Sequence, residues 1–547
     1  MTWLKNNPIA LIFLAGTSIF LFHLNVVPVT IMEARNFITA REMITEGNWL
    51  LTTLNEMPRY EKPPLPSWIT ALFGLAFGLE NIAALRLPTM LMAIILGYMG
   101  YLLSLKLWNN KLLALINALI LLSSFYIIVI TIEAPWDIYT HGFMLIAIYF
   151  LYGFFSFPDN KWKNGLLAGL FIGLSFMSKG PVSLYALLLP FLLAYGSVYK
   201  FKGFGIYRKY VPLLVMILLA TVIGLWWFLY VRLADPDAFL SITKKETANW
   251  SSYNVRPFYY YWSFFVQSGI WSLPALVSLL YPYLKNRVSN KKTYQLTLLW
   301  TIFSVILLSI IPEKKARYLV PVLIPLALNT GFYLEYIIHN FKNSLSPKEK
   351  IPVYFHFSLV ALIGMAYPFI VYFLLKDGLN GLWGYYILSS LGLFVIGVLL
   401  FIKLRKSDLY GCFLLTIALI AAIKLLAMPL MGAMDKNSVY KSISPLREVA
   451  QKDGLNIYCF GEISPEMLWD YGAGIPVLKG EEEITIPDGE KFGVLVIPTD
   501  ENEFKRIFDP EYSYTLKTVY DLNHNADPGS KGHRNRLISN LYIVQKR

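Results

Sequence analysis

The chain has 547 residues, of which 56% are hydrophobic and only 15% are charged. A soluble globular protein is about 45–50% apolar and about 25% charged, so this composition excludes an ordinary soluble domain. The formal net charge of +13 does not indicate nucleic-acid binding, because most Lys and Arg residues flank apolar segments in short loops, as they do in membrane proteins.

Apolar blocks of about 17–25 residues recur along the chain, the length that crosses a hydrocarbon core of about 30 Å. They do not alternate residue by residue as the strands of a membrane β-barrel do. We therefore expect a polytopic α-helical membrane protein with about thirteen transmembrane helices. The first block, residues 8–27, lacks a small-residue cleavage site and is predicted to be a retained helix. The predicted spans start near Pro8, Ala83, Leu112, Trp136, Gly165, Pro181, Val211, Ser263, Tyr294, Tyr318, Phe355, Leu379 and Leu409.

Basic loops set the predicted orientation, because loops rich in Lys and Arg remain in the cytoplasm. The loops that hold Lys106, Lys285 and Lys403 all lie on one side of the membrane if the spans are counted as above. The N-terminus is then inside. The outer face receives the loops 28–82, 233–262 and 312–317 and the C-terminal tail, and a loop as long as the first of these is usually functional.

The tail after about residue 434 changes character. Segments typical of short strands are Leu455–Phe460, Phe492–Pro498, Tyr514–Tyr520 and Leu541–Val544, and segments typical of helices are Ser444–Lys452, Ser464–Tyr471 and Glu501–Phe508. We therefore predict a transmembrane domain at 1–434, which includes the long outer loop 28–82, and a small soluble α/β domain at 435–547. The cysteines, Cys412 in a span and Cys459 in the tail, are not expected to form a disulfide.

Two carboxylates lie at the ends of apolar spans, Glu33 after the first span and Asp137 at the start of another. A carboxylate at the edge of the hydrocarbon costs a few kcal/mol unless water or a partner satisfies it, so both are candidates for a functional site. The structural alternative for Glu33 is an interfacial ion pair with Arg35. For Asp137 it is a favourable interaction with the positive end of a helix dipole.

The sequence Tyr60-Glu61-Lys62-Pro63-Pro64 holds a lysine rigidly, because the two prolines exclude regular helix and stiffen the turn. A compact ammonium group at the membrane surface suits the phosphate of a lipid. Lys62 by itself could instead snorkel to lipid headgroups, an interpretation that explains the adjacent Glu61 less well.

Further cations are predicted on the same outer face, against the positive-inside tendency. Three of them share the short loop Glu313–Tyr318. A violation of the topology rule needs an anionic partner, which a phosphate can supply. The candidate cations beyond Lys62 are Arg86, Lys179, Arg256, Lys314, Lys315 and Arg317.

Acids and cations around one membrane-level region fit sugar transfer from a polyisoprenyl phosphate carrier. The cations would hold the phosphate, each charge-assisted hydrogen bond contributing about 1.5–3 kcal/mol, while a carboxylate would take the proton of the acceptor hydroxyl. Membrane lipids are expected partners and nucleic acid is not. No His-rich spacing predicts a zinc site, no metal ligand is assigned, and a divalent cation held by oxygen ligands stays open as a cofactor.

The charged segments also resemble a known family. Glu33-Ala34-Arg35, Ala40-Arg41-Glu42-Met43, Gly47-Asn48-Trp49 and Tyr60-Glu61-Lys62-Pro63-Pro64 are similar to the first periplasmic loop of the aminoarabinose (4-amino-4-deoxy-L-arabinose) transferases, and the likeness continues through Arg86-Leu87-Pro88, Asp137, Lys179-Gly180-Pro181, Pro257–Tyr261, Lys314, Tyr318 and Pro321. That family belongs to the GT-C membrane glycosyltransferases, which include protein O-mannosyltransferases. The resemblance implies about thirteen spans in the bacterial inner membrane, with the active site and a C-terminal α/β domain in the periplasm.

The resemblance further implies that Arg35, Lys62 and Lys314 meet the donor phosphate. The family has Asp-Glu where this chain has Met32-Glu33, and the Asp is the residue usually assigned to catalysis. Because Met32 does no acid–base chemistry, Glu33 is predicted to be the catalytic carboxylate, and Glu61, Asp137 or a loss of activity are the alternatives. The complete predicted set is Glu33 and Asp137 as catalytic residues, and Arg35, Tyr60, Glu61, Lys62, Arg86, Lys179, Lys314, Arg317 and Tyr318 as residues that bind the donor phosphate or substrate.

The expected function is transfer of a sugar from undecaprenyl phosphate to a lipid or glycan acceptor, and lipid A is one such acceptor. A protein acceptor is an alternative. A transporter or flippase of lipid-linked sugars would also gather charges, but it should place ionisable residues deep within the spans and on both sides of the membrane. A scaffold whose tail binds a partner leaves the charges of the first outer loop unexplained. The concentration of charges at one face favours the enzyme.

Overall fold

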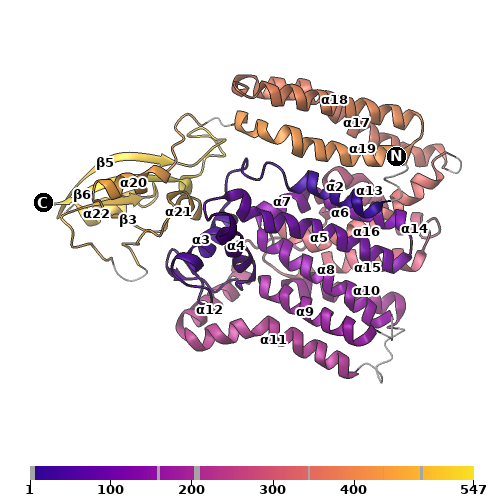
Figure 1. Ribbon diagram of the computed structural model, residues 1–547, viewed down its shortest axis with the longest axis horizontal. Helices are drawn as coiled ribbons and strands as arrows, with labels where there is room; N and C mark the ends of the chain where they lie inside the picture. The colour runs from indigo at the N-terminus through magenta and orange to yellow at the C-terminus, as the bar shows by residue number, and fades with distance from the viewer. Residues whose placement is uncertain are drawn as a thin grey trace. The chain divides into compact units, whose positions relative to one another are not determined.

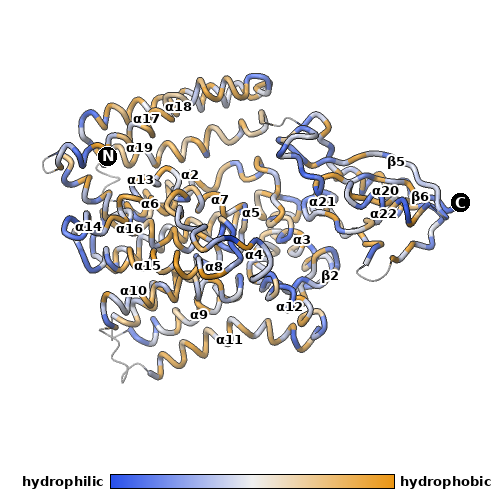
Figure 2. Tube along the Cα trace, turned by 180° about the vertical axis from the view of Figure 1, so that it is seen from behind, coloured by the Kyte–Doolittle hydropathy of each residue, from blue (hydrophilic) through white to orange (hydrophobic). Residues whose placement is uncertain are grey.

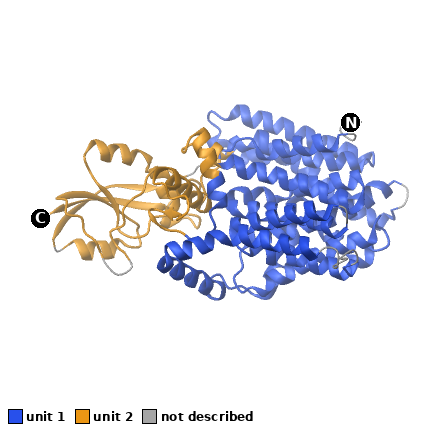
Figure 3. Cartoon of the chain, turned by 60° about the horizontal axis from the view of Figure 1, so that its bottom comes forward, with its two compact units in different colours: residues 1–26, 60–69, 86–430 blue, residues 27–59, 70–85, 431–547 orange. Residues whose placement is uncertain are grey.

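The computed structural model describes residues 7–156, 160–201, 210–342, 345–434, 437–480, 484–509 and 511–547. Contacts divide the chain into two units, which Figure 3 shows in different colours. Unit 1 comprises residues 1–26, 60–69 and 86–430, and unit 2 comprises residues 27–59, 70–85 and 431–547. The predicted domain boundary after residue 434 falls at residues 435–436, which lie outside the described part of the chain.

Unit 1 is a bundle of helices (Figure 1). Its first helices are α2 (Pro8–Phe20), α4 (Leu65–Phe77), α5 (Ile82–Trp108), α6 (Lys111–Ser123), α7 (Phe125–Glu133), α8 (Pro135–Ser156), α9 (Lys161–Lys179), the π-helix η2 (Leu184–Leu188), α10 (Leu189–Tyr199), α11 (Tyr210–Ala234) and α12 (Pro236–Ser252). They are followed by η4 (Phe258–Tyr261), η5 (Phe264–Trp271), α13 (Ser272–Ser278), α14 (Tyr281–Leu284), α15 (Lys291–Ile310), η6 (Ala316–Leu319), α16 (Val320–Asn340), α17 (Pro347–Leu375), η7 (Lys376–Gly378), α18 (Trp383–Arg405), α19 (Leu409–Ala422), the π-helix η8 (Ile423–Ala427) and η9 (Met428–Met434). Helix α4 ends in unit 2, and α5 begins in it.

The helices of unit 1 begin close to the predicted span starts, with one clear difference. Among the described residues, eight helices are long and apolar enough to cross a membrane, or nine if α6 and α7, bent by 46°, form one span. The difference is α17, which begins at Pro347 rather than near Phe355. A capping box starts this helix early, because the Glu349 carboxylate accepts from the Ser346 backbone N–H at 3.0 Å. Hydropathy does not register such a polar first turn.

The spans differ in how much of their surface is buried. In the most apolar window of α16 and α8, 89% and 78% of the residues are buried, compared with 17% in α17 and 22% in α11. α17, α18 and α11 are nonetheless apolar along most of their length (Figure 2), as expected for helices that face lipid. α8, which carries Asp137, therefore lies inside the bundle.

Unit 2 contains a β-sheet (Figure 1). Its four strands lie in the order β3-β4-β6-β5. The β3–β4 pair is parallel, and the β4–β6 and β5–β6 pairs are antiparallel. Phe460, Phe492, Phe504 and Phe508 form an aromatic core against this sheet. The elements are β3 (Ile457–Cys459), β4 (Lys491–Val496), β5 (Tyr512–Asp521) and β6 (Ile538–Lys546), with helices α20 (Ser444–Lys452), α21 (Pro465–Tyr471) and α22 (Glu501–Phe508) and the short η10 (Asn535–Leu537).

Part of the long outer loop belongs to unit 2. Helix α3 (Ile31–Thr45) contributes Ala34 and Ile38 to the apolar cluster that contains Leu446 and Leu541. The hairpin β1 (Thr53–Leu54) and β2 (Met57–Pro58) turns at Asn55 and Glu56, which both have positive φ, as a two-residue hairpin turn requires.

Side-chain hydrogen bonds hold this hairpin in place. The Glu42 carboxylate accepts from the Thr53 hydroxyl at 2.6 Å and from the Asn55 backbone N–H at 2.7 Å. The Asn55 side chain both donates to and accepts from the backbone of Ile475, each at 2.8 Å. Segments that are more than 400 residues apart in the sequence are thus joined within unit 2.

Candidate functional site

Asp137 lies in the first turn of α8 and pairs with a lysine from the end of α9. Its Oδ1 accepts from Lys179 Nζ at 2.5 Å, and the Asp137 side chain is only 2% exposed. Lys179 is the last residue of α9, because Gly180 follows with a φ of 71° and ends the helix. An ion pair inside a bundle costs desolvation energy that its own attraction barely offsets, so stability alone does not explain it.

The second oxygen of Asp137 is not used by the helices around it. Among the described residues, Oδ2 is buried and accepts no hydrogen bond. His141, one turn further along α8, places Nε2 3.9 Å from Oδ1, beyond hydrogen-bond range. A buried carboxylate oxygen with an unfilled acceptor is costly in the resting protein and is available to a hydroxyl donor.

Three cations surround the ring of Tyr318, which lies within η6. The Nζ atoms of Lys179 and Lys315 lie 5.3 and 5.7 Å from the ring centroid, and Cζ of Arg317 lies 5.9 Å from it. The Tyr318 hydroxyl donates to Glu313 Oε1 at 3.0 Å, and Lys315 forms an ion pair with the same oxygen at 2.6 Å. Arg317 Nε is buried without a hydrogen-bond partner among the described residues. The cluster therefore holds more cationic donors than its carboxylates satisfy.

Lys314 is adjacent to this cluster in sequence but has different partners. Its Nζ donates to the backbone carbonyls of Ile311, Arg256 and Pro312 at 2.5, 3.1 and 3.4 Å. Burial lowers the pKa of Lys314, as it does for an ammonium without a carboxylate partner. These three hydrogen bonds hold the loop together, and the contact of Lys314 with a phosphate stays a prediction.

The two outer loops that were predicted to share a face are in contact. Val255 and Glu313 form an antiparallel bridge, and the Arg256 backbone N–H donates to Pro312 O at 3.2 Å. The Tyr261 hydroxyl donates to Lys315 O at 3.1 Å and accepts from the Lys315 backbone N–H at 3.0 Å. The aromatic segment 257–261 thus positions the cationic loop.

Tyr60 and Lys62 contact α11 and α12 through acidic residues. The Tyr60 hydroxyl donates to Asp235 Oδ2 at 2.8 Å, and burial together with this bond raises the pKa of Tyr60. Lys62 Nζ lies 3.3 Å from Glu246 Oε2 in a partly exposed pair. Lys62 is also close enough to Lys179 for its charge to act on that ammonium, as is Arg317. Unit 1 therefore brings Lys62 and Arg317 close to the Asp137–Lys179 pair.

The remaining predicted residues have other surroundings. In unit 2, Glu33 is buried at the third position of α3 and forms a capping box: its Oε2 accepts from the Thr30 backbone N–H at 3.1 Å. Arg35 is exposed on the same helix, and Glu61 is exposed in unit 1. Arg86 is buried on α5 and donates from Nη1 to Leu24 O at 2.5 Å.

The sequence interpretation missed the acidic partners of Tyr60 and Lys62. Asp235 precedes a proline and accepts from the Ala238 backbone N–H at the start of α12, a helix-start signal that was readable from the sequence. Glu246 lies within a polar helix and offered no such signal. His141 lies one helical turn after Asp137, a spacing that identifies it as a neighbour once α8 is recognised.

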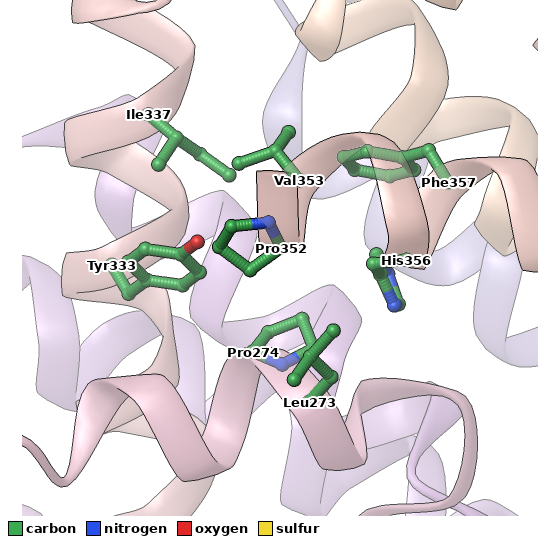
Figure 4. Close-up of a pocket in the computed structure, with 8 residues that line it drawn as sticks. All are labelled: Leu273, Pro274, Tyr333, Ile337, Pro352, Val353, His356 and Phe357. Carbon is green, nitrogen blue, oxygen red and sulfur yellow. The ribbon is translucent and has the colours of Figure 1, made fainter. Parts of the chain in front are cut away.

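Across the described residues, no group of three or more His, Cys, Asp or Glu side chains is arranged to hold a metal ion. A pocket between α13, α16 and α17 is almost wholly apolar and contains none of the predicted residues (Figure 4). Its lining residues are Leu273, Pro274, Tyr333, Ile337, Pro352, Val353, His356 and Phe357.

The chain is similar in sequence to known glycosyltransferases. The model of a family described as dolichyl-phosphate-mannose-protein mannosyltransferase matches residues 61–227, which include Lys62, Asp137 and Lys179. An undecaprenyl phosphate-alpha-4-amino-4-deoxy-L-arabinose arabinosyl transferase from Photorhabdus laumondii is 26% identical over 307 residues, 54% of this chain and 53% of that protein. A transferase of the same name from Proteus mirabilis is 26% identical over 310 residues, 55% of each chain.

A solved structure extends the likeness to the whole fold. The crystal structure of ArnT from Cupriavidus metallidurans bound to undecaprenyl phosphate matches with a TM-score of 0.68 and 17% identity, over 98% of this chain and 97% of that chain. In sequence, the chain spans about half the length of the curated relatives it matches. These matches confirm the resemblance to the aminoarabinose transferases, and the chain has the polytopic helical fold of that ArnT structure.

Proposed function

We propose that the chain is a membrane glycosyltransferase that moves a sugar from a polyisoprenyl phosphate, such as undecaprenyl phosphate, to a lipid or glycan acceptor. The names of the relatives specify arabinosyl transfer and undecaprenyl phosphate, and ArnT was crystallised with undecaprenyl phosphate. 4-Amino-4-deoxy-L-arabinose is therefore the donor sugar to test first, and lipid A the first acceptor.

One observation carries the proposal: the buried Asp137–Lys179 pair, with Arg317 and Lys62 close enough for their charges to act on Lys179. Cations gathered around one carboxylate suit a phosphate leaving group beside an acceptor hydroxyl. The face of Tyr318, lined by the same cations, offers an apolar surface for a sugar ring or an isoprenoid chain.

The proposed reaction is a single displacement at the anomeric carbon, which inverts its configuration. The acceptor hydroxyl oxygen forms the new bond to that carbon as the bond to the phosphate oxygen breaks, and its proton passes to a carboxylate. The phosphate leaves with the bonding electron pair, and Lys62, Lys179 and Arg317 stabilise its charge. Glu33 is proposed as the carboxylate, with Asp137 as the alternative. The role of Glu33, and that of Arg35 at the phosphate, rests on the resemblance.

The proposal includes a topology. We assign about thirteen spans, a cytoplasmic N-terminus, and an active site and C-terminal α/β domain in the periplasm, because the basic loops would then remain in the cytoplasm. The helical segments near every predicted span start are consistent with this arrangement. Cysteine labelling at the ends of α18 in intact cells and inverted vesicles would test the orientation.

The reaction is tested with purified protein, undecaprenyl-phosphate-linked aminoarabinose and lipid A, with mass spectrometry of the product. We expect modified lipid A with wild type, and at least about a hundredfold less with Glu33→Gln. The name of the family that matches residues 61–227 supports a second arm with a peptide acceptor. Product in that arm alone would establish a protein acceptor. Translocation of the donor in proteoliposomes without any transfer would establish a flippase and refute the proposal.

A further inference from the structure

A carboxylate at the end of α7 lies where a negative charge is unfavourable. Glu133 is the last residue of α7, an apolar helix that forms the second half of the bent α6–α7 pair. The carbonyl end of a helix carries partial negative charge and disfavours a carboxylate, and membrane depth adds a desolvation cost. Glu133 is half-buried, and among the described residues no lysine, arginine or histidine forms an ion pair with it. Packing therefore does not explain its position.

A tyrosine of the same helix positions this carboxylate. Tyr126 is buried on α7, and its hydroxyl donates to Glu133 Oε2 at 2.7 Å. The two residues are seven positions apart, about two helical turns, and therefore share one face of the helix. Within the described part of the chain, no group donates to Oε1 of Glu133. One oxygen is thus fixed by the protein, and the other can accept a hydrogen bond from a ligand.

Glu133 belongs to the region of the candidate site. A single residue, Ala134, separates α7 from α8, and the Asp137 backbone N–H donates to Ala134 O at 3.0 Å. Glu133 therefore lies one short turn before Asp137. Helix α7 also packs against η6, which contains Arg317. The charges of Arg317 and Asp137 act on the hydroxyl of Tyr126, which agrees with this placement.

The two acids of this region differ in whether a cation of the protein neutralises them. Asp137 pairs with Lys179 at 2.5 Å, whereas Glu133 has no such partner among the described residues. The other cations near this pair, Lys62 and Arg317, are the ones proposed above to stabilise the donor phosphate. A second carboxylate so close to Asp137 is stabilised by a positive charge, and a ligand can supply it.

We propose that Glu133 binds the ammonium group of an amino sugar carried by the lipid-linked donor. Such a donor presents two opposite charges to the site, its phosphate to the cations and its ammonium to Glu133. An ammonium group donates charge-assisted hydrogen bonds to a carboxylate, and it would offset the repulsion between Glu133 and Asp137. Glu133 would therefore favour an amino sugar over a neutral one. This inference rests on the proposed function, in which the donor is a lipid-linked sugar.

The test is donor binding to the purified full chain in detergent, measured by native mass spectrometry. Two donors are compared: undecaprenyl-phosphate-linked 4-amino-4-deoxy-L-arabinose and the matched L-arabinose donor, which has a hydroxyl in place of the amine. Glu133→Gln is expected to weaken binding of the amino donor at least about tenfold, through loss of a charge-assisted hydrogen bond, and that of the hydroxyl donor less than about twofold. Its melting temperature should not fall, because a charge leaves the carbonyl end of α7.

Two further variants separate recognition of the amine from general effects of charge. Tyr126→Phe removes the hydrogen bond that positions Glu133 and should weaken binding of the amino donor about threefold, with no effect on the hydroxyl donor. The matched control is Asp237→Asn, which removes an exposed carboxylate from the first turn of α12. It should bind both donors as wild type does.

Three results would overturn the proposal. The first is wild-type binding of the amino donor by Glu133→Gln. The second is an equal loss for the two donors, which would indicate a packing effect. The third is an equal loss in Asp237→Asn, which would indicate a long-range effect of charge. Donor discrimination without any sugar transfer would contradict the proposed function alone, whereas a wild type that binds neither donor would contradict both.

Discussion

Asp137 and Glu33 occupy the same kind of position, the first turn of a helix, in different units of the molecule. In unit 1, Asp137 pairs with Lys179 from the end of another helix. In unit 2, Glu33 accepts a hydrogen bond from Thr30 and caps its own helix. A carboxylate at a helix start is favourable in both cases, so the position alone does not reveal a function. The role of such a carboxylate depends on the groups that reach it.

The largest effect is expected from breaking the Asp137–Lys179 ion pair in unit 1. Asp137→Asn leaves Lys179 buried without its anion, which should lower the free energy of unfolding by about 3–5 kcal/mol and reduce sugar transfer at least about a hundredfold. Thermal unfolding in detergent and the transfer assay measure the two effects. The control replaces the pair by apolar residues, Asp137→Leu with Lys179→Met, and should recover stability without activity. A single variant that unfolds at the wild-type temperature would contradict the importance of the pair.

The second prediction concerns Glu33. Glu33→Gln keeps a side chain that completes a capping box, so the melting temperature should stay close to that of wild type. If Glu33 accepts the proton, transfer should fall about a hundredfold or more. Thr30→Ala is the matched control: it should cost about 1 kcal/mol of stability through loss of the cap and leave activity per folded molecule unchanged. Wild-type transfer by Glu33→Gln would exclude Glu33 and leave Asp137 or Glu61 as the catalytic carboxylate.

A third, smaller effect distinguishes two outer lysines. Lys62→Gln removes a partly exposed cation from the phosphate region and should raise the donor KM about tenfold, the equivalent of about 1.4 kcal/mol, with little change in stability. Lys314→Gln should instead lower the melting temperature, because three backbone carbonyls lose their donor, and should change the donor KM less. Equal KM effects would show that Lys314 also reaches the phosphate, as the resemblance implies.

The smallest expected effect lies in unit 2. Hydrogen bonds from Lys505 and Tyr542 lower the pKa of Glu501 from its ordinary value of 4.5. A lowered folded-state pKa contributes stability at pH values above 4.5 that is lost as pH falls through the folded-state pKa. Glu501→Gln should therefore cost a few tenths of a kcal/mol at pH 7 and nothing at a pH below the folded-state pKa. Hydrogen exchange of β6 at the two pH values measures this. An equal loss at both would attribute the effect to packing.

Local patterns were sufficient for the spans of unit 1 and for the secondary structure of residues 444–546 in unit 2. Hydropathy located the spans because each apolar block is long compared with the bilayer core. The strands and helices of residues 444–546 lie where alternation and turn residues predicted them. The late predicted start of α17 shows the limit of hydropathy, because the Ser346–Glu349 capping box is polar. The count of spans stays a prediction, since eight or nine helices of the described residues meet the length and hydropathy criteria.

The candidate site was only partly predictable. The sequence identified Lys62, Asp137, Lys179, Arg317 and Tyr318 as candidates, and unit 1 places all five close to one another. The pairing of Lys62 with Glu246 and the engagement of Lys314 by three carbonyls were not predictable. Lys62 and Glu246 are 184 residues apart, and Lys314 meets Arg256 O across two outer loops. A single sequence contains no signal for contacts between such distant segments.

The sequence by itself determined the class of the protein, its helical spans, the elements of its tail and the residue types that suit a lipid phosphate. These features depend on composition and on short-range periodicity, which act over one or two turns of the chain. Only the tertiary structure decided that Lys179, and not a nearer residue, pairs with Asp137, and that α3 and the β1–β2 hairpin pack in unit 2. Ion pairs and apolar contacts are made between surfaces that folding brings together, and their energies depend on burial that no local pattern encodes.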